Sequence, residues 1–110
     1  MFELRADTQV IVRIGPCLDV NGVTPVTDIT LAAADEAELL KHNGVATVSL
    51  ATATWAAIDG ADGWYNLTLT SSHTDTEGML TVVLQDDNTM LPIHTHFMVL
   101  ASTAYDDKYA

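Results

Sequence analysis

The chain has 110 residues, a length that fits one domain with one modest core. Hydrophobic residues make up 48% of it, which excludes a disordered chain. Four Lys and Arg residues stand against fifteen Asp and Glu residues, for a net charge of -11. This balance argues against nucleic acid and anionic membranes as partners, because both are bound through Lys and Arg.

The first strand is expected at residues 9–14, QVIVRI, which are apolar and β-branched around Arg13. Gly15-Pro16 ends this strand, and Asn21-Gly22 predicts a turn. Residues 26–31, VTDITL, alternate well enough to predict a second strand.

Residues 32–40, AAADEAELL, leave two interpretations open. Ala, Glu and Leu favour a helix, which Asp35 could cap. Only about two turns fit before Asn43-Gly44, and short helices are marginal. We favour a strand over residues 36–41 that runs into an Asn-Gly turn.

The second half of the chain predicts further short strands. Residues 46–50 and 54–58 form either two short strands or one irregular edge. Residues 64–69 place Tyr65, Leu67 and Leu69 on one face, as in a half-buried antiparallel strand. Two more strands are expected at residues 80–85 and 92–100, followed by a polar tail at 101–110.

Seven or eight short strands with regular turn signals are typical of an antiparallel β-sandwich or a small barrel. We expect a single β-sandwich over residues 1–110, Ig-like or jelly-roll-like, with short extended N- and C-terminal arms. Cys17 is the one cysteine, so it forms no internal disulfide and is expected as a small buried hydrophobe.

No secretory signal is recognisable at the start, MFELRADTQ, and no apolar run approaches the roughly 20 residues of a membrane helix. We therefore expect a protein that is made in the cytoplasm and is not secreted.

His94 and His96 are the sharpest local feature with possible chemistry. Residues two apart on a strand point to the same face, so both imidazoles could reach one metal ion. Two ligands make half a site, and copies around a symmetry axis would have to complete it. The alternative is a solvated strand face with two neutral imidazoles. We predict no metal and no cofactor, and keep both histidines as candidates.

Ser71, Ser72, His73 and Asp75 invite a hydrolase interpretation, but catalytic triads are usually assembled from separated segments. No G-x-S-x-G motif surrounds either serine. The acid pairs Asp86-Asp87 and Asp106-Asp107 lack the spacing of a calcium loop. We therefore predict that the chain is not an enzyme.

Three blocks of the sequence carry a family resemblance. They are Ile14-Gly15-Pro16 with Leu18-Asp19 and Asn21-Gly22; Asp62-Gly63-Trp64-Tyr65 through Thr74-Asp75-Thr76 to Gly78-Met79-Leu80; and Met90-Leu91-Pro92-Ile93 through Phe97-Met98-Val99-Leu100 to Ala104-Tyr105-Asp106. Over residues 10–107 the chain resembles small structural proteins of tailed bacteriophages, and the N-terminal domains of baseplate and tail-fibre proteins. Many of those proteins continue past the Tyr-Asp motif, whereas this chain stops at Ala110, which favours a stand-alone accessory role.

The resemblance implies a β-sandwich without catalysis, located in the virion. The expected function is a capsid decoration protein that binds other virion proteins, capsid or tail, as a homo-oligomer for which a trimer is favoured. The alternatives are a tail, collar or fibre-attachment module, and a metal- or carbohydrate-binding domain that uses His94 and His96 or exposed aromatic residues. The expected contact residues are Phe2, Asp86, Asp87, Asn88, Met90, Tyr105 and Tyr109.

Overall fold

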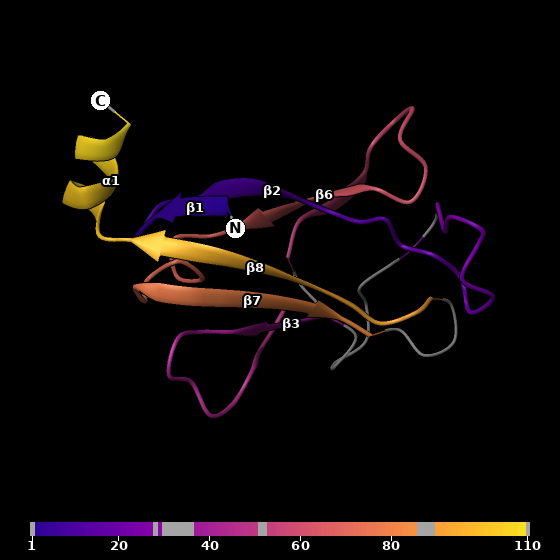
Figure 1. Ribbon diagram of the computed structural model, residues 1–110, viewed down its shortest axis with the longest axis horizontal. Coiled ribbons are helices and arrows are strands. Elements are labelled where there is room, and N and C mark those ends of the chain that lie inside the picture. Colours follow the sequence, from indigo (N-terminus) through magenta and orange to yellow (C-terminus); the bar gives the residue numbers. More distant parts are fainter. Residues whose placement is uncertain (1, 28, 30–36, 51–52, 86–89, 110) are drawn as a thin grey trace.

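The computed structural model describes residues 2–27, 29, 37–50, 53–85 and 90–109 (Figure 1). The described residues form eight strands and one short helix. The strands are β1 (Phe2–Arg5), β2 (Val10–Ile14), β3 (Ala37–Leu40), β4 (Val48–Ser49), β5 (Trp55–Ala57), β6 (Tyr65–Leu69), β7 (Gly78–Leu84) and β8 (Ile93–Leu100), and the helix is α1 (Ser102–Lys108).

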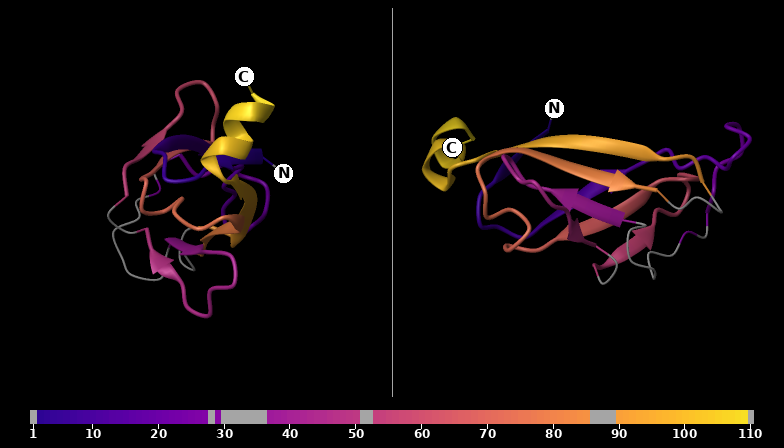
Figure 2. Two further views of the ribbon diagram at one scale, coloured as in Figure 1. Left: turned by 90° about the vertical axis from the view of Figure 1, so that its left-hand side faces the viewer. Right: turned by 90° about the horizontal axis from the view of Figure 1, so that it is seen from below.

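Two sheets face each other, as the two side views show (Figure 2). The larger sheet has the strand order β1-β8-β7-β3-β4, and the smaller has the order β2-β6-β5. Strand β1 runs parallel to β8, with Phe2 opposite Phe97, while the other pairs are antiparallel. The predicted all-β fold with two sheets is confirmed at this level.

The core lies between the sheets and follows from the alternation of the strands. Along β6, Tyr65, Leu67 and Leu69 are buried while the residues between them are partly exposed. Strand β7 repeats the pattern with Leu80, Val82 and Leu84. Cys17 is fully buried, and loss of solvation raises the pKa of its thiol to about 11. It packs as the small hydrophobe that the sequence predicted.

The ambiguous segment before Asn43 ends in a strand. Residues 37–40 form β3, which pairs with β7 and with β4, so the favoured interpretation is confirmed for these residues. Strands β4 and β5 belong to different sheets, and the alternative of one irregular edge is therefore wrong.

The strand expected at residues 26–31 is not present at Val26, Thr27 or Ile29, and the other three residues lie outside the described ones. Two aromatic residues hold this segment instead. The Tyr65 hydroxyl donates to the Val26 carbonyl (2.5 Å) and accepts from the Ile29 amide (3.2 Å). Trp55 stacks on Tyr65 and donates its indole N–H to the Ile29 carbonyl.

Both chain ends differ from the extended arms that the sequence predicted. Residues 2–5 form an edge strand, and residues 102–108 form a helix at one end of the molecule (Figure 1). Ion pairs fasten this helix to β1: Arg5 binds both carboxylate oxygens of Asp106, and Lys108 binds Glu3. An isolated helix of this length is marginal in water. It forms here because of its contacts with β1, which the polar pattern of the tail does not indicate.

No helix within the described ranges has the length and apolar character needed to cross a membrane.

Candidate functional site

His94 and His96 lie on the outer face of β8, as the alternation predicted. Both side chains are exposed, and their ring centroids are 5.1 Å apart. The Nδ1 atom of His96 is 3.0 Å from the hydroxyl of Thr81 on the neighbouring strand β7. The described residues contain no group of three or more His, Cys, Asp or Glu side chains that could hold a metal ion. A site here would therefore need ligands from beyond the described residues or from another molecule.

The polar turn after β6 is held together by its own hydroxyl and imidazole groups. The Nδ1 atom of His73 accepts a hydrogen bond from the Thr70 amide (3.0 Å). Partial burial is the main cause that lowers the pKa of His73, and the positive charge of the nearby Lys41 lowers it further. Lys41 also binds the Asp75 carboxylate (2.8 Å) and the Ser72 carbonyl. These groups form a network that fixes the shape of the turn.

Thr74 ties this turn to the segment between β1 and β2. Its side chain is completely buried. The Thr74 hydroxyl donates to the Thr8 carbonyl (2.9 Å) and accepts from the Thr8 amide (3.1 Å). The Asp7 amide also donates to the Thr74 carbonyl. The hydroxyl therefore satisfies two backbone groups that come from a distant part of the chain.

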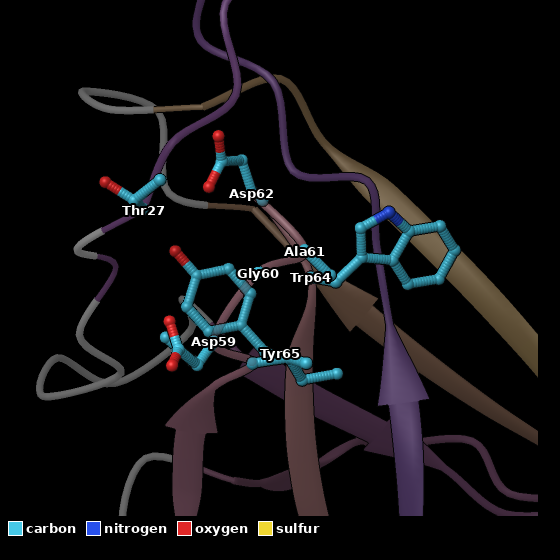
Figure 3. A pocket seen from close by; sticks show the side chains of 10 residues that line it. Thr27, Asp59, Gly60, Ala61, Asp62, Trp64 and Tyr65 are labelled. Atoms are coloured by element: carbon cyan, nitrogen blue, oxygen red, sulfur yellow. The ribbon is translucent and has the colours of Figure 1, made fainter.

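A pocket of about 280 Å³ lies at the turn into β6 (Figure 3). Asp59, Asp62 and Thr27 surround the ring of Tyr65, while the indole of Trp64 points away from them. Both carboxylates are exposed, and the Tyr65 hydroxyl is already bonded to the backbone. The pocket arises only because Tyr65 fixes the Thr27 segment beside the turn.

A larger hollow of about 610 Å³ opens between the edges of the two sheets. We call it the edge groove; it is lined by Phe2 on β1, residues 11–13 on β2 and residues 95–97 on β8. Phe2 is 66% exposed and Ile11 is 62% exposed. Arg13, also exposed, forms no ion pair with any described residue, whereas Arg5, Lys41 and Lys108 each have one. Sequence reasoning identified Phe2 but missed Ile11 and Arg13, because strand alternation does not reveal which strand lies at an edge.

The remaining predicted contact residues fall in different places. Met90 is 2% exposed and belongs to the core, so the prediction of a surface contact is wrong for it. Tyr105 is half-buried beside Phe2, in a hollow of about 130 Å³. Tyr109 is 55% exposed, and its hydroxyl donates to the Glu3 carboxylate. Three of the predicted contact residues lie outside the described residues: Asp86, Asp87 and Asn88.

No protein-family model matches the chain, and neither a curated protein nor a solved structure matches it.

Proposed function

We propose that this protein is a non-enzymatic structural protein of a bacteriophage virion that decorates the capsid by binding other virion proteins. The edge groove carries the proposal, because two large apolar side chains are exposed there on a molecule of net charge -11. Exposed apolar surface bordered by polar residues is typical of protein-binding sites. The proposed location in the virion is supported by the sequence resemblance, which covers most of the chain.

An Ig-like sandwich is the second part of the proposal. When β2 to β8 are read in chain order as B, C, C′, D, E, F and G, one sheet has the order B-E-D and the other contains C′-C-F-G. This is the strand order of immunoglobulin-type sandwiches. A jelly roll would need two Greek keys of four strands each, which the observed order favours less.

The third part is assembly into a homotrimer. Its support is the exposed Tyr109 immediately after α1, because Tyr is enriched where protein surfaces meet. Light scattering on the purified chain tests it, and the expected mass is that of three chains. A monomer at every concentration would contradict this part without affecting the capsid assignment.

The capsid assignment is tested by counting copies of the protein in purified phage particles with quantitative mass spectrometry. Hundreds of copies in a simple ratio to the major capsid protein are expected. A few to a few dozen copies would instead favour the first alternative, a tail, collar or fibre-attachment module of the same fold. Absence from the particle would contradict both assignments.

One observation favours a second class of function, a metal-binding domain. His94 and His96 are adjacent and exposed, and the contact with Thr81 orients the His96 ring so that Nε2 is left to coordinate. Metal analysis of the purified protein decides between the classes. Less than one ion per three chains would exclude a shared site on a symmetry axis.

A further inference from the structure

We propose that the edge groove receives an extended strand from a partner protein, which pairs with the free edge of β2. This deepens the proposed role in protein contact by specifying the partner's chemistry. It rests on that role but does not require that the protein is located in the virion.

The outer edge of β2 is available for a further strand. Strand β2 is the outermost strand of the smaller sheet and pairs only with β6 among the described residues. An edge strand directs a row of backbone N–H and C=O groups outward, and an extended peptide can bind to them by adding a strand. Immunoglobulin sandwiches place a further strand, strand A, at the position beside the one that corresponds to β2. In this chain the N-terminal strand β1 pairs with β8 in the other sheet instead.

The side chains of β2 define the pattern that an added strand must have. Ile11 and Arg13 point outward, and Val12 between them points into the core. Residues on neighbouring strands lie side by side on the same face of the sheet. The inward-facing side chains of the partner would therefore lie beside Val12, in the hollow that Phe2 and Phe97 border. They must be apolar, and the hollow of about 610 Å³ has room for more than one of them.

The charge of Arg13 determines which residues the partner strand should carry at its outward-facing positions. Arg13 is the one basic residue without an ion pair to a described residue, and it lies at the groove. A carboxylate on the partner strand beside Arg13 would complete an opposite-charge pair. A second copy of this chain fits less well, because its own β2, VIVRI, carries no acidic residue to place beside Arg13. The occupant is thus a segment of another protein in which apolar and acidic residues alternate.

Three synthetic peptides of about eight residues, the length of an ordinary strand, test this chemistry. One alternates valine with aspartate, one has lysine in place of each aspartate, and one has the first composition with its valines contiguous. Binding is followed through the backbone amide signals of the nitrogen-15-labelled chain. The alternating aspartate peptide is expected to shift the signals of residues 10–14 and 95–97 saturably. The lysine peptide should bind about fivefold more weakly or worse.

Two variants of the chain test the outward-facing positions of β2. Arg13→Glu should reverse the preference, so that the lysine peptide binds more tightly than the aspartate peptide. Ile11→Asp should abolish binding, while Val45→Asp is the matched control at a fully exposed position distant from the groove. The dispersion of the amide signals verifies that each variant is folded.

Several outcomes would overturn the proposal. They are no saturable shift at β2 with the alternating aspartate peptide at millimolar concentration, equal binding of the contiguous peptide, and an unchanged preference in Arg13→Glu. If self-association without any peptide protects the β2 amides from hydrogen exchange, the occupant is a second copy of the chain. This result would also overturn the proposal. None of these results bears on the copy number in virions, so failure here is distinguishable from failure of the proposed function.

Discussion

At the scale of single residues, Thr74 shows how a side chain in a turn can organise distant backbone. Its buried hydroxyl satisfies both the amide and the carbonyl of Thr8. Thr74→Val keeps the shape but leaves these groups without their partner, so the free energy of unfolding should fall by about 1–3 kcal/mol. Urea denaturation measures the change. Thr76→Val is the control, because its hydroxyl bonds to the exposed Asp75 and to no other described residue, and a change within about 0.5 kcal/mol is expected. Equal effects of the two substitutions would contradict the role assigned to Thr74.

Gly78, at the start of β7, is required for two separable reasons. Its φ of 113° is rare for residues with a side chain, and an added Cβ would collide with the ring of His42. Gly78→Ala should therefore cost about 1–3 kcal/mol or more of unfolding free energy. Gly60→Ala is the matched control: its φ is 84°, but nothing lies within 4 Å of the added atom. If the collision matters, His42→Ala will restore part of the stability lost in Gly78→Ala; no restoration would leave backbone strain as the sole cause.

At the scale of elements, α1 depends on charge for its attachment to β1. The hydrogen bond from Arg5 lowers the pKa of Asp106, and those from Lys108 and Tyr109 lower the pKa of Glu3. Carboxyl groups with lowered pKa values stabilise the attachment above their ordinary pKa values, 3.8 and 4.5, and this contribution is lost as the pH falls through the lowered values. Acidification through these lowered pKa values, below pH 3.8 for Asp106, should therefore release α1 from β1. The backbone amide signals of residues 102–108 report this release.

Asp106→Asn separates this attachment from the general effect of acid. It should release α1 at neutral pH while β7 and β8 stay folded, since the amide keeps the size of the carboxyl but loses the charge that Arg5 binds. Asp107→Asn, one residue further along the helix, is the control and should leave α1 attached. Release by both substitutions would mean that helix charge in general, and not the pair with Arg5, holds the element.

At the scale of the whole molecule, the net charge of -11 governs stability and solubility together. Excess negative charge repels itself in the compact state, and salt screens this repulsion. Raising the ionic strength from about 0.01 M to about 0.15 M should therefore raise the urea midpoint at neutral pH. Asp107→Asn, which removes one charge outside the described ion pairs, should make this dependence shallower. A midpoint that falls with salt would show that attractive ion pairs outweigh the net repulsion.

The fold was predictable where a pattern has a local cause. Alternation predicted β6, and strand-like composition predicted β7 and β8. The Asn43-Gly44 turn favoured a strand at β3 although the composition of that segment also suits a helix. The prediction was wrong for a segment whose conformation depends on side chains far away in the sequence. Residues 26–31 were predicted as a strand from their alternation, but Val26 and Ile29 are held by Tyr65 and Trp55.

The candidate site was predictable only in part. The same-face position of His94 and His96 follows from strand geometry and was found. Met90 was expected at a surface contact and is core, because it joins a hydrophobic cluster whose members come from all along the chain. Ile11 and Arg13 became conspicuous only once β2 was known to be an edge strand.

The sequence by itself determined the class of structure and its charge: short alternating strands, turns at Gly and Asn, one buried cysteine and a strongly acidic composition. These properties depend on each residue's neighbours in the chain. The tertiary structure alone decided the sheet order, the pairing of β1 with β8, the attachment of α1 and the groove beside β2. Each of these joins residues from opposite parts of the chain, and hydrophobic alternation specifies which face of a strand is buried but not which strand lies beside it.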